Sequence, residues 1–160
     1  MARRATTVIA LTAAVILTVV FVSNFQRQGN QQTPSAVKAK ETACLTASVS
    51  SEGCDFDLGI ADTGSERTKG LSGRESLAQK SGMLFIFDAA GEQCMWMKNM
   101  RFSIDMLWLN EKKDIVKIQN SVAPETYPES FCAPGVKYVI ELNSGDVKTA
   151  NFVVGQQVKF

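Results

Sequence analysis

The sequence contains no histidine among its 160 residues. This absence removes the commonest general base and the commonest imidazole metal ligand, so catalysis by a serine or cysteine activated by histidine is excluded. Cysteine is scarce too: there are four, and no two of them are separated by only two residues. A zinc site built from paired cysteines is therefore not predicted, and no other cofactor is predicted either.

Clustered positive charge is also missing. The chain has 17 basic and 16 acidic residues, and removal of the N-terminal pair Arg3 and Arg4 leaves 15 basic residues against 16 acidic ones. Lys112 and Lys113 are adjacent, but they stand alone in a predicted turn. Phosphate binding requires grouped basic side chains, so nucleic acid is not predicted as a partner.

A long apolar run is present at the N-terminus. Residues 5–25 carry no charge and contain no proline or glycine, and the next charge is Arg27. Roughly 20 apolar residues suffice to cross a bilayer as a helix, so residues 1–23 are predicted to be a transmembrane signal anchor. A cleaved signal peptide is the alternative, although no clear small-x-small cleavage site follows the run. Arg3 and Arg4 predict a cytoplasmic N-terminus, a single pass through the cell membrane and a C-terminal domain outside the cytoplasm.

Two further regions follow the predicted anchor. Residues 24–42 are polar and rich in glutamine, which is typical of a flexible linker. Residues 43–160 are predicted to form one domain, since the chain has 45% apolar and 21% charged residues, close to globular averages. The predicted organisation is thus an anchor, a linker and one exported domain.

All four cysteines lie in the predicted exported part, which fits an oxidising compartment. Of the three pairings that four cysteines allow, we favour Cys94–Cys132 together with Cys44–Cys54. A simple hairpin about residues 51–53 would place Cys44 opposite Gly59, so the second bridge requires a bulge or a looser turn. Free buried thiols are the alternative.

Short alternating segments predict a mainly β domain. Strands are expected over residues 45–49, 56–60, 83–87, 94–98, 104–109, 115–118 and 137–142, with a last one within 152–160. Ala90-Gly91 is expected to separate the strand over 83–87 from the strand over 94–98. Residues 122–134 are expected to form a long loop. Thr63 and Glu66 have capping-box spacing, which predicts a short helix over 65–69 that ends at Gly70. This pattern favours a compact β-sandwich or barrel with one or two short helices.

Several motifs resemble one known family. They are A-D-T at 61–63, E-R at 66–67, G-L at 70–71, G-R at 73–74, Leu77, G-M-L-F-I-F at 82–87, W-M-K-N at 96–99, I-D at 104–105, Y-V-I-E-L-N-S-G at 138–145 and Gly155. Over residues 54–160 the chain resembles the bacterial and archaeal family catalogued as domain of unknown function 192. The resemblance implies a small, jelly-roll-like β domain and names no activity. Met95 and Met100 replace the family's usual aromatic and threonine-like residues, and Cys94 and Cys132 lie outside its general pattern.

Polar residues in or beside these motifs form the first candidate site. They are Arg67, Arg74, Lys98, Asn99, Asp105 and Glu141. A groove lined by them could bind a small anionic or sugar-like ligand, with the basic groups on a carboxylate and Asp105 on hydroxyls. The alternative is an ion-pair network that fixes loops. An enzymatic version uses Asp105 and Glu141 as an acid and base pair on envelope saccharides.

Two other groups of residues have a structural and a functional interpretation. The sulfur-rich set Met83, Met95, Met97, Met100, Met106 and Cys94 suits cuprous copper, but methionine in an apolar strand is more typical of a core, so no metal is predicted. Alternation would place Met95 and Met97 on one strand face, with Trp96 and Lys98 on the other. The set Tyr127, Pro128, Phe131 and Pro134 could contact a partner or fold onto the sheet.

The sequence thus favours a membrane-anchored, extracytoplasmic β domain that binds cell-envelope material or an envelope protein, with no catalytic residue. The alternatives are a hydrolase of envelope saccharides that uses a carboxylate pair, and a copper-handling domain.

Overall fold

The structure is a computed structural model that describes residues 42–46 and 55–160. These residues lie in one compact unit, Lys40–Phe160. The predicted anchor, 1–23, and the predicted linker, 24–42 except for its last residue, lie outside the described residues and stay predictions. Among the helices of the described part, none is long and apolar enough to span a bilayer.

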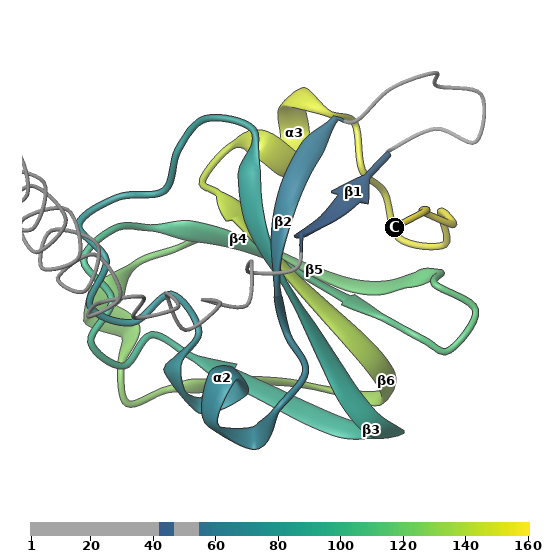
Figure 1. The fold of residues 1–160 in the computed structure, drawn as a ribbon, viewed down its shortest axis with the longest axis horizontal. Coiled ribbons are helices and arrows are strands. Elements are labelled where there is room, and N and C mark those ends of the chain that lie inside the picture. The colour runs from purple at the N-terminus through teal and green to yellow at the C-terminus, as the bar shows by residue number, and fades with distance from the viewer. Residues whose placement is uncertain (1–41, 47–54) are drawn as a thin grey trace, which may run out of the picture. The chain divides into compact units, whose positions relative to one another are not determined.

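Six strands form a single sheet, which confirms the prediction of a mainly β domain (Figure 1). The strands are β1 Thr42–Leu45, β2 Phe56–Ala61, β3 Ser81–Trp96, β4 Ile104–Leu109, β5 Ile115–Val122 and β6 Ser130–Asn143. Their order across the sheet is β1-β2-β3-β6-β4-β5. β3 and β6 therefore form the centre of the sheet, and their buried residues, such as Met83 and Glu141, have a neighbouring strand on each side.

The sheet is mixed because one connection is a crossover. β2 and β3 are parallel, and α2 (Gly64–Lys69) lies in the connection between them. The helix begins as predicted, with Thr63 accepting from the Glu66 amide and the Glu66 carboxylate accepting from the Thr63 amide. It ends at Gly70, whose φ of +46° and close approach to the Phe85 ring disfavour a larger residue.

The two central strands are longer than predicted. The expected interruption at Ala90-Gly91 is wrong, since β3 continues through it to Trp96. Register shifts on either side of Gly91 absorb the irregularity, so the chain bends without leaving the sheet. The predicted loop over 122–134 is likewise shorter, because it contains the 3₁₀ turn η1 (Pro124–Thr126) and β6 already begins at Ser130.

The C-terminal segment differs from the prediction as well. A short helix, α3 (Asp146–Thr149), follows β6, and residues 152–160 contain no strand. Two isolated bridges, Thr46 with Lys159 and Asp114 with Gln157, pair this segment with both the end of β1 and the start of β5. The chain end thus lies beside the opposite edges of the sheet.

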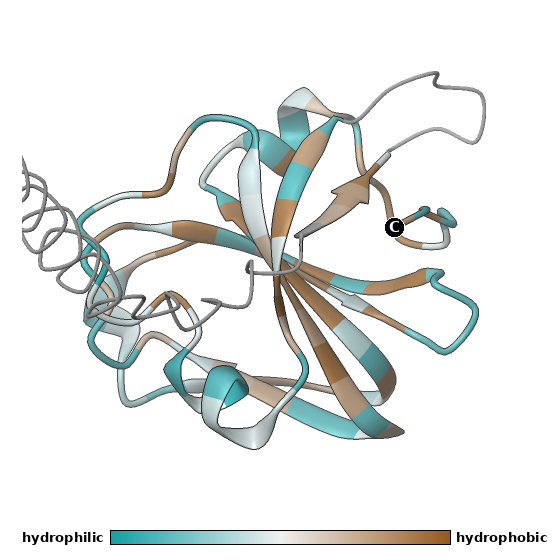
Figure 2. Cartoon of the chain, viewed as in Figure 1, coloured by the Kyte–Doolittle hydropathy of each residue, from teal (hydrophilic) through white to brown (hydrophobic). Residues whose placement is uncertain are grey.

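Both faces of the sheet are covered. The sheet itself does not close, so the architecture is not the predicted sandwich or barrel. One core cluster includes Phe85, Met106 and Val139, and the other includes Leu84, Leu107 and Ile140, so alternate residues of the same strands point to opposite faces. Leu71, just after α2, joins the first cluster and Val147 of α3 joins the second. The two helices accordingly lie on opposite sides of the sheet, and the apolar residues concentrate along the central strands (Figures 1 and 2).

The predicted disulfide between Cys94 and Cys132 is confirmed. The two residues are directly paired across β3 and β6, 38 positions apart in sequence. Cys44 is also disulfide-bonded, while its predicted partner, Cys54, lies outside the described residues. Cys44 pairs with Asp57 in the β1–β2 ladder rather than with Gly59, so the register assumed for a simple hairpin is wrong.

Candidate ligand-binding pocket

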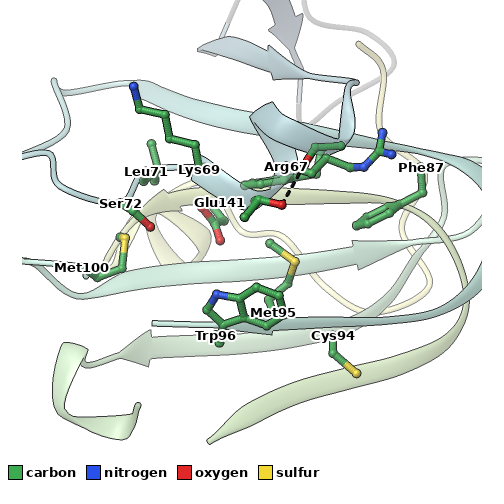
Figure 3. A pocket seen from close by; sticks show the side chains of 14 residues that line it. Arg67, Lys69, Leu71, Ser72, Phe87, Cys94, Met95, Trp96, Met100 and Glu141 are labelled. Atoms are coloured by element: carbon green, nitrogen blue, oxygen red, sulfur yellow. Dashed lines mark hydrogen bonds between the residues drawn. The ribbon is translucent and has the colours of Figure 1, made fainter. Parts of the chain in front are cut away.

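A pocket of about 170 Å³ lies between α2 and the first face of the sheet. Its mouth includes Gly64, Thr68 and Lys69 of the helix and the indole of Trp96, which is 44% exposed. Its interior is apolar and holds one acidic side chain, Glu141 (Figure 3). The remaining lining residues are Arg67, Gly70, Leu71, Ser72, Phe85, Phe87, Cys94, Met95 and Met100.

Glu141 lies on the central strand β6, between Met83 of β3 and Met106 of β4. Its side chain is 3% exposed, and its carboxyl group forms no hydrogen bond or ion pair with any described residue. Burial raises the pKa of Glu141 from its ordinary value of 4.5 to about 8. The group is therefore mainly a neutral carboxylic acid at pH 7, able to donate one hydrogen bond and to accept others.

Arg67 fixes the helix side of the pocket. Its Nη1 donates to the carbonyls of Asp62 and Ile86, and its Nη2 lies 3.6 Å from the Asp88 carboxylate. The guanidinium also lies 5.5 Å from the centre of the Phe87 ring. Because these contacts use the donors and one face of the group, Arg67 ties α2 to β3 and lines the pocket without pairing with Glu141.

Lys98 and Asn99 support the pocket through their backbones. The Ser72 hydroxyl donates to the Lys98 carbonyl, and the Gly73 amide donates to the Asn99 carbonyl. Asn99 has φ +57°, a conformation that asparagine tolerates better than most residues. Both side chains are exposed, so the W-M-K-N segment holds the loop after α2 in place and does not supply a charged group to the pocket.

Asp105 and Arg74 lie elsewhere. Asp105 is fully buried on the second face of the sheet, where its carboxylate accepts from the amides of Ser121, Gly145 and Val147. The half-buried side chain of Arg74 forms no hydrogen bond or ion pair with any residue of the described ranges, and it does not line the pocket. Of the six predicted polar residues, the structure brings only Arg67 and Glu141 to one cavity.

The alternative that uses Asp105 and Glu141 as a catalytic pair is contradicted for a geometric reason. Asp105 is opposite Leu142 in the β4–β6 ladder, and Glu141 is opposite Met106. Directly paired residues share a face, and Leu142 and Met106 belong to different core clusters. The two carboxyl groups therefore point to opposite sides of one sheet and cannot act on the same bond.

The methionines divide between core and pocket. Met83, Met97 and Met106 are buried in the first core cluster, Met95 is buried and also lines the pocket, and Met100 is half-buried at its edge. Cys94 is oxidised in the disulfide, so its sulfur is not available as a thiolate ligand. The predicted alternation is confirmed, because Met95 and Met97 are buried while Trp96 and Lys98 are exposed.

The aromatic and proline-rich segment has a mixed environment. Tyr127 and Pro128 are joined by a cis peptide bond, and both are exposed, as is Pro134. Phe131 packs against the first core cluster and is adjacent in sequence to the disulfide-bonded Cys132. The segment thus folds partly onto the sheet and leaves Tyr127 at the surface.

Sequence reasoning missed most of the pocket. Leu71, Phe85, Phe87 and Trp96 are each apolar residues in segments that read as ordinary core or helix-flanking positions. The one available signal was Trp96, an aromatic residue on the outer face of a strand whose alternate residues are buried. The two methionines at which the chain departs from the resembled motif, Met95 and Met100, both line the same cavity.

These features define a class: a small mixed-sheet domain with one apolar pocket and a buried acid in it. The chain belongs to the family catalogued as domain of unknown function 192, described as uncharacterised, which matches residues 46–160. The resemblance found in the sequence is therefore confirmed.

Two solved structures share this fold. One is described as a putative transcription regulator from Sinorhizobium meliloti; it is 29% identical, with a TM-score of 0.68 over 75% of this chain and 94% of its own. Another, described as a protein of unknown function from Novosphingobium aromaticivorans, is 20% identical, with a TM-score of 0.64 over 78% of this chain and 89% of its own. A search of curated proteins found no match.

Proposed function

We propose that this protein is a membrane-anchored binding module outside the cytoplasm, and that the pocket around Glu141 takes a small group belonging to cell-envelope material or to an envelope protein. The observation that carries the proposal is a carboxyl group that is 3% exposed, has no protein partner among the described residues and lines an apolar cavity. Burying such a group without a partner costs stability, so a ligand that satisfies it is the natural explanation.

The location rests on the sequence. The uncharged run at residues 5–25 with Arg3 and Arg4 before it supports a membrane anchor with the domain outside. The disulfide between Cys94 and Cys132 supports an oxidising compartment. Pocket and anchor together favour a receptor-like role at the outer side of the membrane.

Other functions have less support. A nucleic-acid role, which the description of the Sinorhizobium meliloti protein would suggest, is opposed by charge, since residues 43–160 hold 12 basic and 15 acidic side chains. A hydrolase would need a second catalytic group besides Glu141, and Asp105 is on the other face of the sheet. A copper site would have two pocket thioethers, Met95 and Met100, and no cysteine thiolate.

The proposal is tested by a thermal-shift screen of the full chain in detergent with disulfides intact. The probes are glucosamine, N-acetylglucosamine, acetate, choline and cuprous ion. At a hundredfold its dissociation constant, a ligand stabilises by about 2.7 kcal/mol, which shifts the unfolding temperature by several degrees in a domain of this size. We expect at least one such shift, and we expect Glu141→Gln to remove it.

Glu92→Gln is the matched control, because Glu92 lies on the neighbouring strand β3 with its side chain exposed to solvent. It makes the same side-chain replacement outside the pocket and should leave the shift unchanged. A silent screen, or a hit that survives Glu141→Gln, would overturn the proposal.

A further inference from the structure

We infer that the group taken by the pocket is an organic ammonium, whose positive charge pairs with the Glu141 carboxylate while its carbon substituents contact the aromatic walls. This inference rests on the proposed function and names the chemical class of the ligand. It is drawn from three features of the pocket: an acid without a cation, aromatic faces around it, and a volume that fits a compact head group.

The acid has no cationic partner among the residues that the structure describes. The two charged side chains of α2 at the pocket are Arg67, which is held by the Asp62 and Ile86 carbonyls and by Asp88, and Lys69, which is exposed at the mouth. The neighbours of Glu141 on β3 and β4, Met83 and Met106, carry no charge. Burial is the cause of the raised pKa of Glu141, and no cation or donor of residues 42–46 and 55–160 stabilises its ionised form. A ligand cation would provide that missing stabilisation.

The walls suit a cation with carbon substituents. The aromatic residues Phe87 and Trp96 line the pocket, and Met95 and Met100 add polarisable thioethers (Figure 3). Phe85 also lines it. A cation over an aromatic face is attracted by the ring quadrupole, and more strongly when water is excluded. Phe87 already has the Arg67 guanidinium 5.5 Å from its centre, which leaves Phe85 and Trp96 as the rings for a ligand. Methionine side chains adapt to the shape of such a group.

The volume limits the size of the group. The pocket measures about 170 Å³, and a cavity of about 150 Å³ accommodates benzene. A trimethylammonium or alkylammonium head group is of that size, with the rest of its molecule extending through the mouth. A whole disaccharide would not enter, so a saccharide could reach Glu141 only through one small substituent such as an amino group.

A neutral ligand that accepts a hydrogen bond is the main competitor, and pH separates the two. An ammonium binds the ionised Glu141, whereas a neutral acceptor binds the protonated acid. With a pKa of about 8, the ionised fraction rises about tenfold between pH 7 and pH 9. Affinity for an ammonium should therefore increase about tenfold over this interval, and affinity for a neutral acceptor should fall by a similar factor.

The test measures binding of choline and of its neutral isostere 3,3-dimethylbutan-1-ol to the full chain by calorimetry at pH 7 and pH 9. Choline keeps its charge at both pH values. We expect its dissociation constant to fall about tenfold at the higher pH and the neutral isostere to bind more weakly than choline at pH 9. Glu141→Gln should abolish the pH dependence, and Glu92→Gln should preserve it.

A second variant tests the aromatic contact. Trp96 is 44% exposed, so Trp96→Ala leaves the core intact. It should weaken choline binding about two- to fivefold, the loss expected for one partly exposed cation–π contact. Val116→Ala, at an exposed position on β5 away from the pocket, should have no effect.

The outcomes that overturn the inference differ from those that overturn the proposed function. Equal or tighter binding of the isostere, or affinity that falls with pH, rejects the ammonium but keeps the pocket as a binding site. Failure of both choline and glucosamine to bind, while a probe without an ammonium group gives a shift that depends on Glu141, does the same. Failure of every probe rejects both.

Discussion

Asp105 and Glu141 lie on adjacent inner strands of one sheet, and both side chains are at most 3% exposed. Asp105 points to the face covered by α3 and accepts three backbone amides from Ser121, Gly145 and Val147. Glu141 points to the face covered by α2 and has no hydrogen-bond partner among the described residues. Of two buried carboxyl groups on neighbouring strands, the protein thus provides hydrogen-bond donors to Asp105 and none, among the described residues, to Glu141.

The difference separates a structural carboxylate from a candidate functional one. Asp105 joins the start of α3 to the end of β5, and its charge helps to raise the pKa of Asp146, after burial itself. The hydrogen bonds of Asp105 therefore stabilise that end of the domain. Glu141 organises no backbone, and its unsatisfied acid opens into a cavity. A buried polar group without a structural role is the stronger indication of a ligand.

The largest effect is expected when Asp105 is changed to Asn. One amide oxygen cannot accept all three amides, and the new NH₂ group would face backbone donors. We expect a loss of about 3 kcal/mol in the free energy of unfolding, or roughly 10 °C in unfolding temperature. Thermal unfolding followed by circular dichroism measures it. Unchanged stability would show that the hydrogen bonds of Asp105 do not hold this end of the domain.

The effect expected for each unit of pH through the titration of Glu141 is smaller. Its pKa of about 8 in the folded state lies above the ordinary value of 4.5, so the folded state holds its proton more tightly. The free energy of unfolding should therefore fall as pH rises from about 4.5 to 8, by at most about 1.4 kcal/mol per pH unit from this group.

Urea unfolding of the wild type and Glu141→Gln across this range isolates that contribution, because all other groups titrate in both proteins. The wild type should lose stability relative to the variant as pH rises. Parallel curves for the two proteins would contradict the assignment of a buried, unpaired acid. Glu92→Gln should follow the wild type.

The smallest effect is expected in the energetic coupling between Asp105→Asn and Glu141→Gln. The carboxyl groups share no hydrogen-bond partner and point to opposite faces, and the Asp105 charge does not contribute to the pKa of Glu141. The change in the free energy of unfolding of the double variant should therefore equal the sum of the two single changes within about 0.5 kcal/mol. A coupling above about 1 kcal/mol at pH 6, measured by urea unfolding, would show that a substitution at one carboxyl group changes the environment of the other.

Much of the local structure was predictable because it depends on short-range chemistry. The capping box of Thr63 and Glu66 fixed the start of α2, and alternation identified β2 and β4 almost to the residue. The pairing of Cys94 with Cys132 was favoured among the three that four cysteines allow, and the structure confirms it. The ends of β3 and β6 were not predictable, because a bulge at Gly91 looks like a turn in the sequence.

The candidate site was predictable only in part. Glu141 and Arg67 were singled out as polar residues in motifs, but so were Asp105 and Arg74, which the structure places elsewhere. Which of two acids meets a cavity depends on strand register, and a shift of one residue exchanges the faces. The apolar walls, including Phe85 and Trp96, look like ordinary strand residues until the crossover brings α2 over them.

The sequence by itself determined the β class, the family and the apolar N-terminal run, because composition, motif spacing and alternation act within a few residues of one another. Only the tertiary structure decided that the sheet stays open, that its two buried carboxyls face opposite sides, and that one of them lies in a pocket. Those outcomes depend on the pairing of β6 with both β3 and β4, contacts between residues far apart in the chain. No local pattern encodes which side chain will be left without a partner once these strands have paired.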